Sequence, residues 1–232
     1  MCGNIKENLT KIKEQIGNNN VKIIAVTKYA NQEQVLEAYK LGISDFGESY
    51  VQDAVGKIEK FSSQHVFESQ EFKNPIKWHF IGRLQKNKVK HVVGNFCLIH
   101  SIDSVELVNL TNQIAERKGV IQDILLQANI SGELSKAGFS VDDLKKSFSK
   151  INELSNIRIL GLMTIAPNIS NELTIQNHFE QLFSLKDELN NKNMTNLKEL
   201  SMGMTNDYKI AIKCGSTMLR IGRALFKRDE GG

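Results

Sequence analysis

An alternation of short apolar runs with helical stretches is the feature that most constrains the fold of this chain. Eight runs have the length and residue types of buried strands, and apolar residues at helical spacing precede the first run and separate most of the others. The runs are Lys22–Thr27, Ser44–Gly47, Lys77–Gly82, Cys97–Ile102, Ile124–Ile130, Ile157–Ile165, Leu197–Met202 and Met218–Gly222. This alternation is typical of a parallel sheet covered by helices, and eight such units in 232 residues favour a closed barrel over an open sheet.

The sequence predicts a single α/β domain, a (β/α)8 barrel of the TIM type, with an extra helix before the first strand. Pro75 and Pro167 are the only prolines, and they lie at the expected entrance of the third strand and the exit of the sixth. No stretch rich in Pro or Gly divides the chain. We therefore expect one domain over residues 1–226 and a polar tail over 227–232.

Composition narrows the class of partner and the compartment. The net charge is +4, and no block of like charges occurs, so a nucleic-acid groove is not indicated. The first 17 residues carry charges and no apolar run, so we expect neither a signal peptide nor a membrane-spanning helix there. Three cysteines without a CxxC spacing suit a reducing compartment. These features predict a cytoplasmic protein.

The end of the first strand delivers a candidate nucleophile. Ile24, Val26 and Lys28 share one face by the two-residue period of a strand, so an apolar strand ends by placing a lysine amine at its C-terminal rim. Active sites of barrels lie at this rim. A partly desolvated lysine there could form a Schiff base with a carbonyl, although a lysine leaving a strand is more often simply solvated.

The last two strands end in segments suited to a phosphate group. Ser201 and Gly203 stand where the seventh strand turns toward a helix, for which Asn206 or Asp207 could be the N-cap. The eighth strand follows a Gly-Ser-Thr turn and ends in Arg220-Ile221-Gly222-Arg223. Glycine allows close backbone approach and arginine brings fixed charge. The loops after strands seven and eight commonly bind phosphate in barrels, whereas the bland alternative is that these glycines only form turns.

The third strand carries an inward histidine. Trp78 and Phe80 should face outward under helices, and His79 and Ile81 should face the barrel interior. We include His79 among the candidate cofactor-binding residues, although a lone inward histidine is more often a satisfied polar group of the core. No histidine or cysteine pair has metal-ligand spacing, so no metal site is expected. The chain also lacks a nucleophile elbow, a Walker loop and a dinucleotide fingerprint.

Ordered segments along nearly the whole chain resemble one family. They include Ala25-Val26-Thr27-Lys28, Phe46-Gly47-Glu48, Trp78-His79-Phe80-Ile81-Gly82, His100-Ser101-Ile102-Asp103-Ser104, Asn129-Ile130-Ser131 with Lys136 and Gly138, Gly161-Leu162-Met163, Ser201-Met202-Gly203-Met204 and Arg220-Ile221-Gly222. Together they are similar to the pyridoxal 5′-phosphate (PLP) homeostasis proteins, small cytoplasmic proteins related to the barrel domain of alanine racemase. The resemblance implies PLP as the cofactor.

The resemblance also implies roles for single residues. Lys28 would be joined to PLP as a Schiff base, and Arg220 would lie near the pyridine nitrogen and keep it unprotonated because a guanidinium retains its proton. Ser201, Gly203 and Gly222 would contact the phosphate. The chain departs from the family pattern at a few positions, including Ser49 for asparagine, Thr205 for serine and Arg223 for threonine. Arg223 would either bind the phosphate more tightly or point away.

Three functions were weighed against these residues. The favoured one is a carrier in vitamin B6 homeostasis that holds PLP on Lys28 and buffers or delivers it without robust catalysis, in transient contact with PLP-dependent apo-enzymes and as a monomer. The alternative is a PLP-dependent racemase, which needs a second base that we cannot locate in the barrel sequence. A Schiff-base aldolase would use the same amine, but the Arg220 segment argues against it.

Overall fold

The eight predicted strands form one closed parallel barrel. The structure, a computed structural model, describes residues 5–28, 30–62, 75–133, 136–167, 169 and 171–226. The strands are β1 (Lys22–Val26), β2 (Asp45–Glu48), β3 (Lys77–Phe80), β4 (Leu98–Ile102), β5 (Gln122–Gln127), β6 (Ile157–Met163), β7 (Glu199–Ser201) and β8 (Met218–Ile221). Each strand pairs with the next in chain order, and β8 closes the barrel on β1. The predicted (β/α)8 fold is confirmed.

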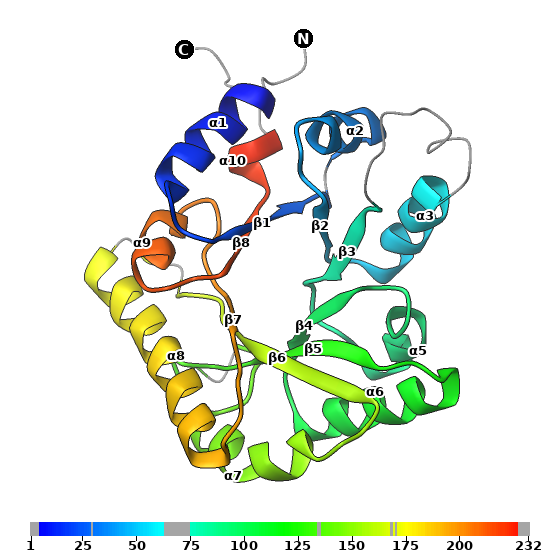
Figure 1. Cartoon of the computed structure of the whole chain (residues 1–232), viewed down its shortest axis with the longest axis vertical. Helices are drawn as coiled ribbons and strands as arrows, with labels where there is room; N and C mark the ends of the chain where they lie inside the picture. Colours follow the sequence, from blue (N-terminus) through cyan, green and yellow to red (C-terminus); the bar gives the residue numbers. More distant parts are fainter. Residues whose placement is uncertain are drawn as a thin grey trace.

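Helices surround the barrel and include the predicted extra helix before β1 (Figure 1). They are α1 (Ile5–Ile16), α2 (Gln32–Lys40), α3 (Val51–Ser62), the 3₁₀ turn η1 (Lys86–Lys88), α5 (Val89–Val92), α6 (Val105–Lys118), α7 (Val141–Asn152), α8 (Glu172–Asn193), α9 (Tyr208–Lys213) and α10 (Arg223–Phe226). The first and last of these lie side by side, and Asn8 Nδ2 donates to the Leu225 carbonyl at 3.1 Å. The two ends of the described chain thus meet on one flank of the barrel.

Local sequence signals explain where several helices begin and end. Asn31 and Gln34 form a reciprocal capping box at the start of α2, which satisfies two backbone N–H groups that the helix cannot. Ser104 accepts from Leu107 N–H at the start of α6, and Gly119 ends that helix in a left-handed conformation at φ 64°. Capping by residues close in sequence makes these boundaries largely independent of the barrel.

Strand ends were the least accurate part of the sequence prediction. The run predicted as Ile124–Ile130 is β5, which begins two residues earlier and ends at Gln127. Beyond it, Ala128 forms only an isolated bridge with Phe139, because the loop after β5 folds back on the strand. The run predicted to end at Ile165 leaves the ladder after Met163. The predicted tail at 227–232 lies outside the described residues, and the domain boundary there stays a prediction.

The core has two compartments, one on each face of the barrel wall. The outer compartment lies between strands and helices, where Trp78 packs against Phe61 of α3 and Phe80 against Phe96, with ring centroids 5.8 and 5.5 Å apart. The outward prediction for Trp78 and Phe80 is therefore confirmed. The inner compartment is a small apolar cluster formed by Ile24, Leu98, Leu125, Met163 and Met218. Several polar side chains are buried as well, among them His79, His100, Ser201 and Arg220.

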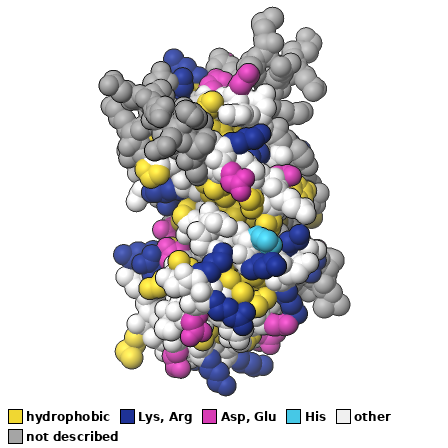
Figure 2. Space-filling view, turned by 90° about the vertical axis from the view of Figure 1, so that its right-hand side faces the viewer, with side chains coloured by type: hydrophobic (Ala, Val, Ile, Leu, Met, Phe, Trp, Pro, Cys, Tyr) yellow, Lys and Arg dark blue, Asp and Glu magenta, His cyan; other side chains and the backbone are white. Residues whose placement is uncertain are grey.

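The surface carries charges of both signs, as the face in Figure 2 illustrates. Within the described part of the chain, no helix combines the length and the apolarity that crossing a membrane requires.

Candidate binding site at the barrel rim

Lys28 lies where the sequence places it, just beyond the C-terminal end of β1, and the residue is exposed. The strand ends at Val26, so the lysine belongs to the turn that follows. That turn is anchored by its neighbour: Thr27 Oγ1 donates to Glu48 Oε1 at 2.6 Å, and Lys57 Nζ donates to the Thr27 carbonyl at 2.6 Å. The backbone that presents Lys28 is thereby tied to β2 and α3.

The register between β1 and β8 brings the Lys28 turn and the predicted site residues at the end of β8 to one side of the barrel. Ile24 pairs with Arg220 and Ala25 with Ile221, so the two strands end together at the rim. Arg220 N–H donates to the Gly203 carbonyl at 3.0 Å, which places the turn after β7 against β8. Segments almost 200 residues apart in sequence thus meet beside the Lys28 turn.

Arg220 is buried inside the barrel and held by three hydrogen bonds. Its Nη1 donates to the carbonyl and the Oγ of Ser201 at 2.8 and 2.7 Å, and its Nη2 donates to the Thr164 carbonyl at 2.9 Å. Burial lowers the pKa of Arg220 to about 10, which still leaves the guanidinium protonated at neutral pH. A guanidinium has five N–H donors, so this arrangement leaves two for a ligand.

The two predicted phosphate glycines have different structural reasons to be glycine. Gly203 adopts φ +94°, and a Cβ there would lie 2.6 Å from Ala211 Cβ and 2.8 Å from Leu219 Cδ2. Its turn therefore requires glycine for the fold itself. A Cβ at Gly222 would come no nearer than 3.4 Å, to Val26 Cβ, which is ordinary contact. No protein atom demands glycine at 222, and the missing side chain leaves the rim open next to the end of β1.

Backbone amides at these two turns lack protein acceptors. Among the described residues, the N–H groups of Gly203, Gly222 and Arg223 make no hydrogen bond, whereas those of Met202, Met204 and Ala224 do. Ala224 N–H donates to Thr205 Oγ1 at 3.2 Å, so the hydroxyl retained at 205 joins the two turns. Neighbouring unengaged N–H groups form a favourable place for an anion.

Arg223 and Asp207, two further residues singled out in the sequence, lie beside these turns. The Arg223 side chain is exposed at the start of α10. Asp207 occupies the N-cap position of α9, as one of the two predicted candidates, but it caps no helical N–H. Its Oδ1 accepts instead from Met204 N–H at 2.5 Å, within the turn after β7. This bond stabilises the turn that carries Gly203.

His79 and Ser201 belong to a buried polar chain that the sequence did not reveal. His79 faces the interior, where its Nε2 lies 3.0 Å from Asp45 Oδ1 and its Nδ1 lies 2.9 Å from His100 Nε2. His100 Nδ1 lies 2.8 Å from Ser201 Oγ, which in turn accepts from Arg220. The Ser201 hydroxyl predicted at the phosphate is thus engaged inside the barrel. Alternation along each strand could have marked Asp45 and His100 as inward, but not as partners.

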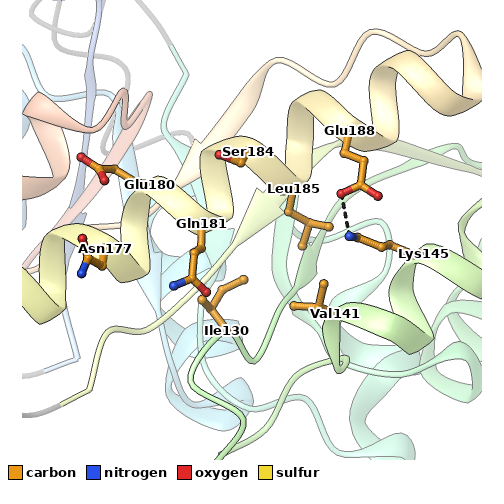
Figure 3. A pocket seen from close by; sticks show the side chains of 9 residues that line it. All are labelled: Ile130, Val141, Lys145, Asn177, Glu180, Gln181, Ser184, Leu185 and Glu188. Atoms are coloured by element: carbon orange, nitrogen blue, oxygen red, sulfur yellow. Dashed lines mark ion pairs between the residues drawn. The ribbon is translucent and has the colours of Figure 1, made fainter.

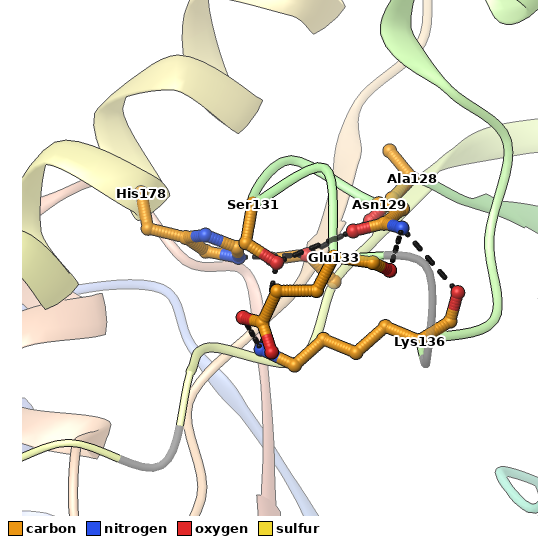
Figure 4. Close-up of polar contacts among 7 residues, drawn as sticks. Ala128, Asn129, Ser131, Glu133, Lys136 and His178 are labelled. Atoms are coloured by element: carbon orange, nitrogen blue, oxygen red, sulfur yellow. Dashed lines mark hydrogen bonds and ion pairs between the residues drawn. The ribbon is translucent and has the colours of Figure 1, made fainter.

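The loop after β5 forms a second polar cluster at the same rim (Figure 4). Lys136 Nζ pairs with Glu133 Oε1 at 2.7 Å, and Asn129 Nδ2 donates to the carbonyls of both residues. On the neighbouring helix α8, His178 Nε2 lies 2.9 Å from Thr164 Oγ1. A cavity of about 160 Å³ opens next to this loop, between the ends of β3, β5 and β6. It lies over the barrel mouth.

A larger cavity, of about 480 Å³, lies on the outside of the barrel between α7 and α8 (Figure 3). Lys145 and Glu188 bridge it with an ion pair of 2.6 Å. Its lining is Ile130, Val141, Lys145, Asn177, Glu180, Gln181, Ser184, Leu185 and Glu188, and none of the predicted site residues is among them. Size alone therefore does not locate the site, and the rim remains the candidate.

Comparisons with known proteins agree with this architecture. The family model for the N-terminal domain of alanine racemase matches residues 2–229. The pyridoxal phosphate homeostasis protein of Aquifex aeolicus is 36% identical over 232 residues, covering 96% of this chain and 97% of that protein. Its counterpart from Synechocystis is 38% identical and covers 89% and 90%.

A solved structure gives the same result. PipY of Synechococcus elongatus, determined with PLP bound, is 32% identical, superposes with a TM-score of 0.84, and covers 96% of this chain and 99% of its own. The family suggested by the sequence motifs is thereby confirmed. The chain belongs to the alanine racemase N-terminal domain family and, within it, to the pyridoxal phosphate homeostasis proteins.

Proposed function

We propose that this chain binds PLP at the C-terminal rim of the barrel and acts as a carrier in vitamin B6 homeostasis, with Lys28 as the residue that holds the cofactor. The names of its relatives and the PLP-bound PipY structure support the cofactor and the role. One observation within the chain carries the proposal. The β1–β8 register and the bond from Arg220 N–H to the Gly203 carbonyl bring the Lys28 turn, the strand that carries Arg220 and the turns with unengaged amides to one side of the barrel.

Each of these groups suits one part of PLP. The cofactor supplies an aldehyde, which condenses with a lysine amine to form a Schiff base and water. Lys28 is the amine that the strand end presents. The amides of Gly203, Gly222 and Arg223 accommodate a phosphate, and the exposed Arg223 guanidinium adds charge close to them. The space left by the missing side chain at Gly222 lets that phosphate approach the backbone.

Arg220 accounts for the lack of strong catalysis. Its guanidinium stays protonated at neutral pH, so it can donate to the pyridine nitrogen but cannot supply that nitrogen with a proton. An unprotonated ring withdraws electrons less effectively, and withdrawal of electrons is what PLP enzymes use to stabilise carbanions. We accordingly propose a cytoplasmic, monomeric carrier that meets PLP-dependent apo-enzymes transiently.

The test is to titrate the protein with PLP and to monitor binding by the visible absorption spectrum. We expect one equivalent of PLP to give the band of a Schiff base in the wild type and in Lys90→Ala, an exposed lysine away from the rim, and no such band in Lys28→Ala. An unchanged band in Lys28→Ala would contradict the proposal.

Solvent exchange of the α-proton of amino acids separates a carrier from a racemase. We expect exchange in D2O no faster than with free PLP. Exchange that is well above this rate and depends on Lys28 would replace the carrier with an enzyme.

A further inference from the structure

The buried polar chain has a single consistent direction. It runs from Arg220 through Ser201, His100 and His79 to Asp45, with distances of 2.7, 2.8, 2.9 and 3.0 Å between successive polar atoms. An ionised carboxylate can only accept, and a guanidinium can only donate. With both imidazoles neutral and protonated on Nε2, each group in the chain donates toward Asp45 and accepts from the Arg220 side.

Any additional proton disrupts this arrangement. A proton on His79 would make its Nδ1 a donor, which would force His100 to accept on Nε2 and to donate from Nδ1 to Ser201. Ser201 Oγ would then face two donors, and its own hydrogen would lose the acceptor that His100 provides. Burial lowers the pKa of His79, and it lowers that of His100 further, so the neutral arrangement is the one present at neutral pH.

The far end of the chain reaches the opposite side of the barrel. Asp45 begins β2, and Ser44 Oγ donates to its Oδ2 at 2.6 Å. A cavity of about 370 Å³ at the N-terminal ends of β1 and β2 is lined by Asp45, Lys13 and Lys22, among others. Although burial opposes ionisation, the bonds from His79 and Ser44 lower the pKa of Asp45, so a carboxylate ends the chain.

Arg220 has no carboxylate bonded directly to it among the described residues. Asp207 is near enough to favour its charged form, but the Asp207 carboxylate accepts from Met204 N–H. The direct acceptors of the guanidinium are the carbonyls of Ser201 and Thr164 and the Ser201 hydroxyl. The Ser201 hydroxyl can direct its lone pairs to Arg220 only if its own O–H points elsewhere. In this arrangement the O–H donates a hydrogen bond to His100 Nδ1.

We propose that Asp45, His79 and His100 are positioning residues for the bound cofactor, which act through Ser201 to orient the Arg220 guanidinium and to oppose its charge from the other end of the barrel. The inference rests on the proposed function, because it assigns Arg220 to the PLP ring. It extends that function to residues that reach Arg220 only through the hydrogen bonds of Ser201.

The first test needs no cofactor. In the apoprotein labelled with ¹⁵N-histidine, NMR at pH 7 should show His79 and His100 neutral, each with its proton on Nε2. A charged imidazole, or a proton on Nδ1 of either residue, overturns the proposal whether or not the protein binds PLP.

The second test uses PLP affinity and the visible spectrum of the bound cofactor. Asp45→Asn keeps the shape of the side chain and removes its charge, and we expect the Kd for PLP to rise roughly fivefold. For His100→Phe, which frees the Ser201 hydroxyl to rotate, we expect a rise of more than about tenfold and an altered spectrum.

Leu98→Ala is the matched control. Leu98 precedes His100 by two residues on the same face of β4 and belongs to the apolar cluster, so its truncation should lower stability and leave affinity and spectrum unchanged. If Asp45→Asn and His100→Phe both keep the wild-type affinity and spectrum, and the wild-type protein carries PLP on Lys28, the positioning role alone is refuted. A wild type that fails to bind PLP would instead refute the proposed function.

Discussion

The rim and the interior of this barrel use polar groups in opposite ways. In the interior chain from Arg220 to Asp45, every member is bonded to the next. At the rim, the amides of Gly203, Gly222 and Arg223 have no protein partner among the described residues. Buried polar groups must be satisfied by the fold itself, whereas unsatisfied groups at an accessible edge are available to a ligand. The difference separates polar groups whose partners lie within the fold from polar groups that remain available to a ligand.

The largest expected effect is a loss of stability in acid, and its cause is the protonation of buried histidines. Burial, followed by nearby charge that includes Arg220, keeps the pKa of His100 well below its usual value, and burial lowers the pKa of His178 to about 4. Below pH 6.5 the unfolded chain therefore binds protons that the native chain does not. The free energy of unfolding should fall by about 2 kcal/mol per histidine between pH 7.5 and 5.0.

Urea unfolding at pH 7.5, 6.5, 5.5 and 5.0 checks this prediction. His178 does not belong to the buried polar chain from Arg220 to Asp45. Replacing it should remove only its own contribution to the change of unfolding free energy with pH. Stability that stays constant over this range would show that the interior histidines titrate in the native state as they do in the unfolded chain, and that burial does not lower their pKa values.

The second prediction compares the two rim glycines. Gly203→Ala places a methyl group 2.6 Å from Ala211 Cβ in a backbone conformation that alanine rarely adopts, so it should destabilise the protein by about 3 kcal/mol or more. Gly222→Ala should change stability by less than about 1 kcal/mol, because its Cβ has room, and should weaken PLP binding about tenfold. Thermal unfolding and PLP titration measure the two effects. Equal stability losses would remove the distinction between a structural and a binding glycine.

The third prediction compares a hydroxyl in each region. Ser201→Ala leaves His100 Nδ1 without its donor and removes one acceptor of Arg220, so we expect a loss of about 2 kcal/mol. Thr205→Ala removes only the bond from Ala224 N–H at the part-buried rim, and should lose less than about 1 kcal/mol. Denaturant midpoints of the two variants give the comparison directly. A larger loss of stability in Thr205→Ala than in Ser201→Ala would contradict the expectation that interior hydrogen bonds contribute more to stability than those at the rim.

The smallest effect is expected for an ion pair on the surface. Arg158 makes a bidentate pair with Asp123 at 2.7 and 2.8 Å, but its side chain is 66% exposed. Water and salt screen such a pair, and Arg158→Ala should lower stability by less than about 1 kcal/mol. The measurement is urea unfolding at low and high salt. If Arg158→Ala lowered the free energy of unfolding as much as Ser201→Ala, burial would not determine which of these polar interactions matters more for stability.

Sequence reasoning reached the fold and the rim because both follow from local patterns. Strand periodicity and strand ends can be recognised in runs of four to nine residues. They predict that Lys28, Arg220 and both glycines lie near the C-terminal ends of the strands, and the structure places them there. Strand boundaries were less certain, as at β5, because the loop that folds back over Ala128 decides where the ladder ends.

The interior chain could not be found in this way. Asp45, His79, His100 and Ser201 are separated by 34, 21 and 101 residues, and only barrel closure makes them neighbours. His79 was recognised as inward, but its partners were not. The exposed side chain of Lys28 matches the alternative that a lysine leaving a strand is solvated, and the strand pattern alone does not decide between that alternative and a desolvated amine.

The most direct test of the account is to reduce the PLP-loaded protein with borohydride and map the modified peptide by mass spectrometry. Reduction converts a Schiff base into a stable secondary amine and so marks the lysine that carried it. We predict one pyridoxyl group per chain, on Lys28. A label on another lysine, or no label at saturating PLP, would contradict the assignment of the rim as the cofactor site.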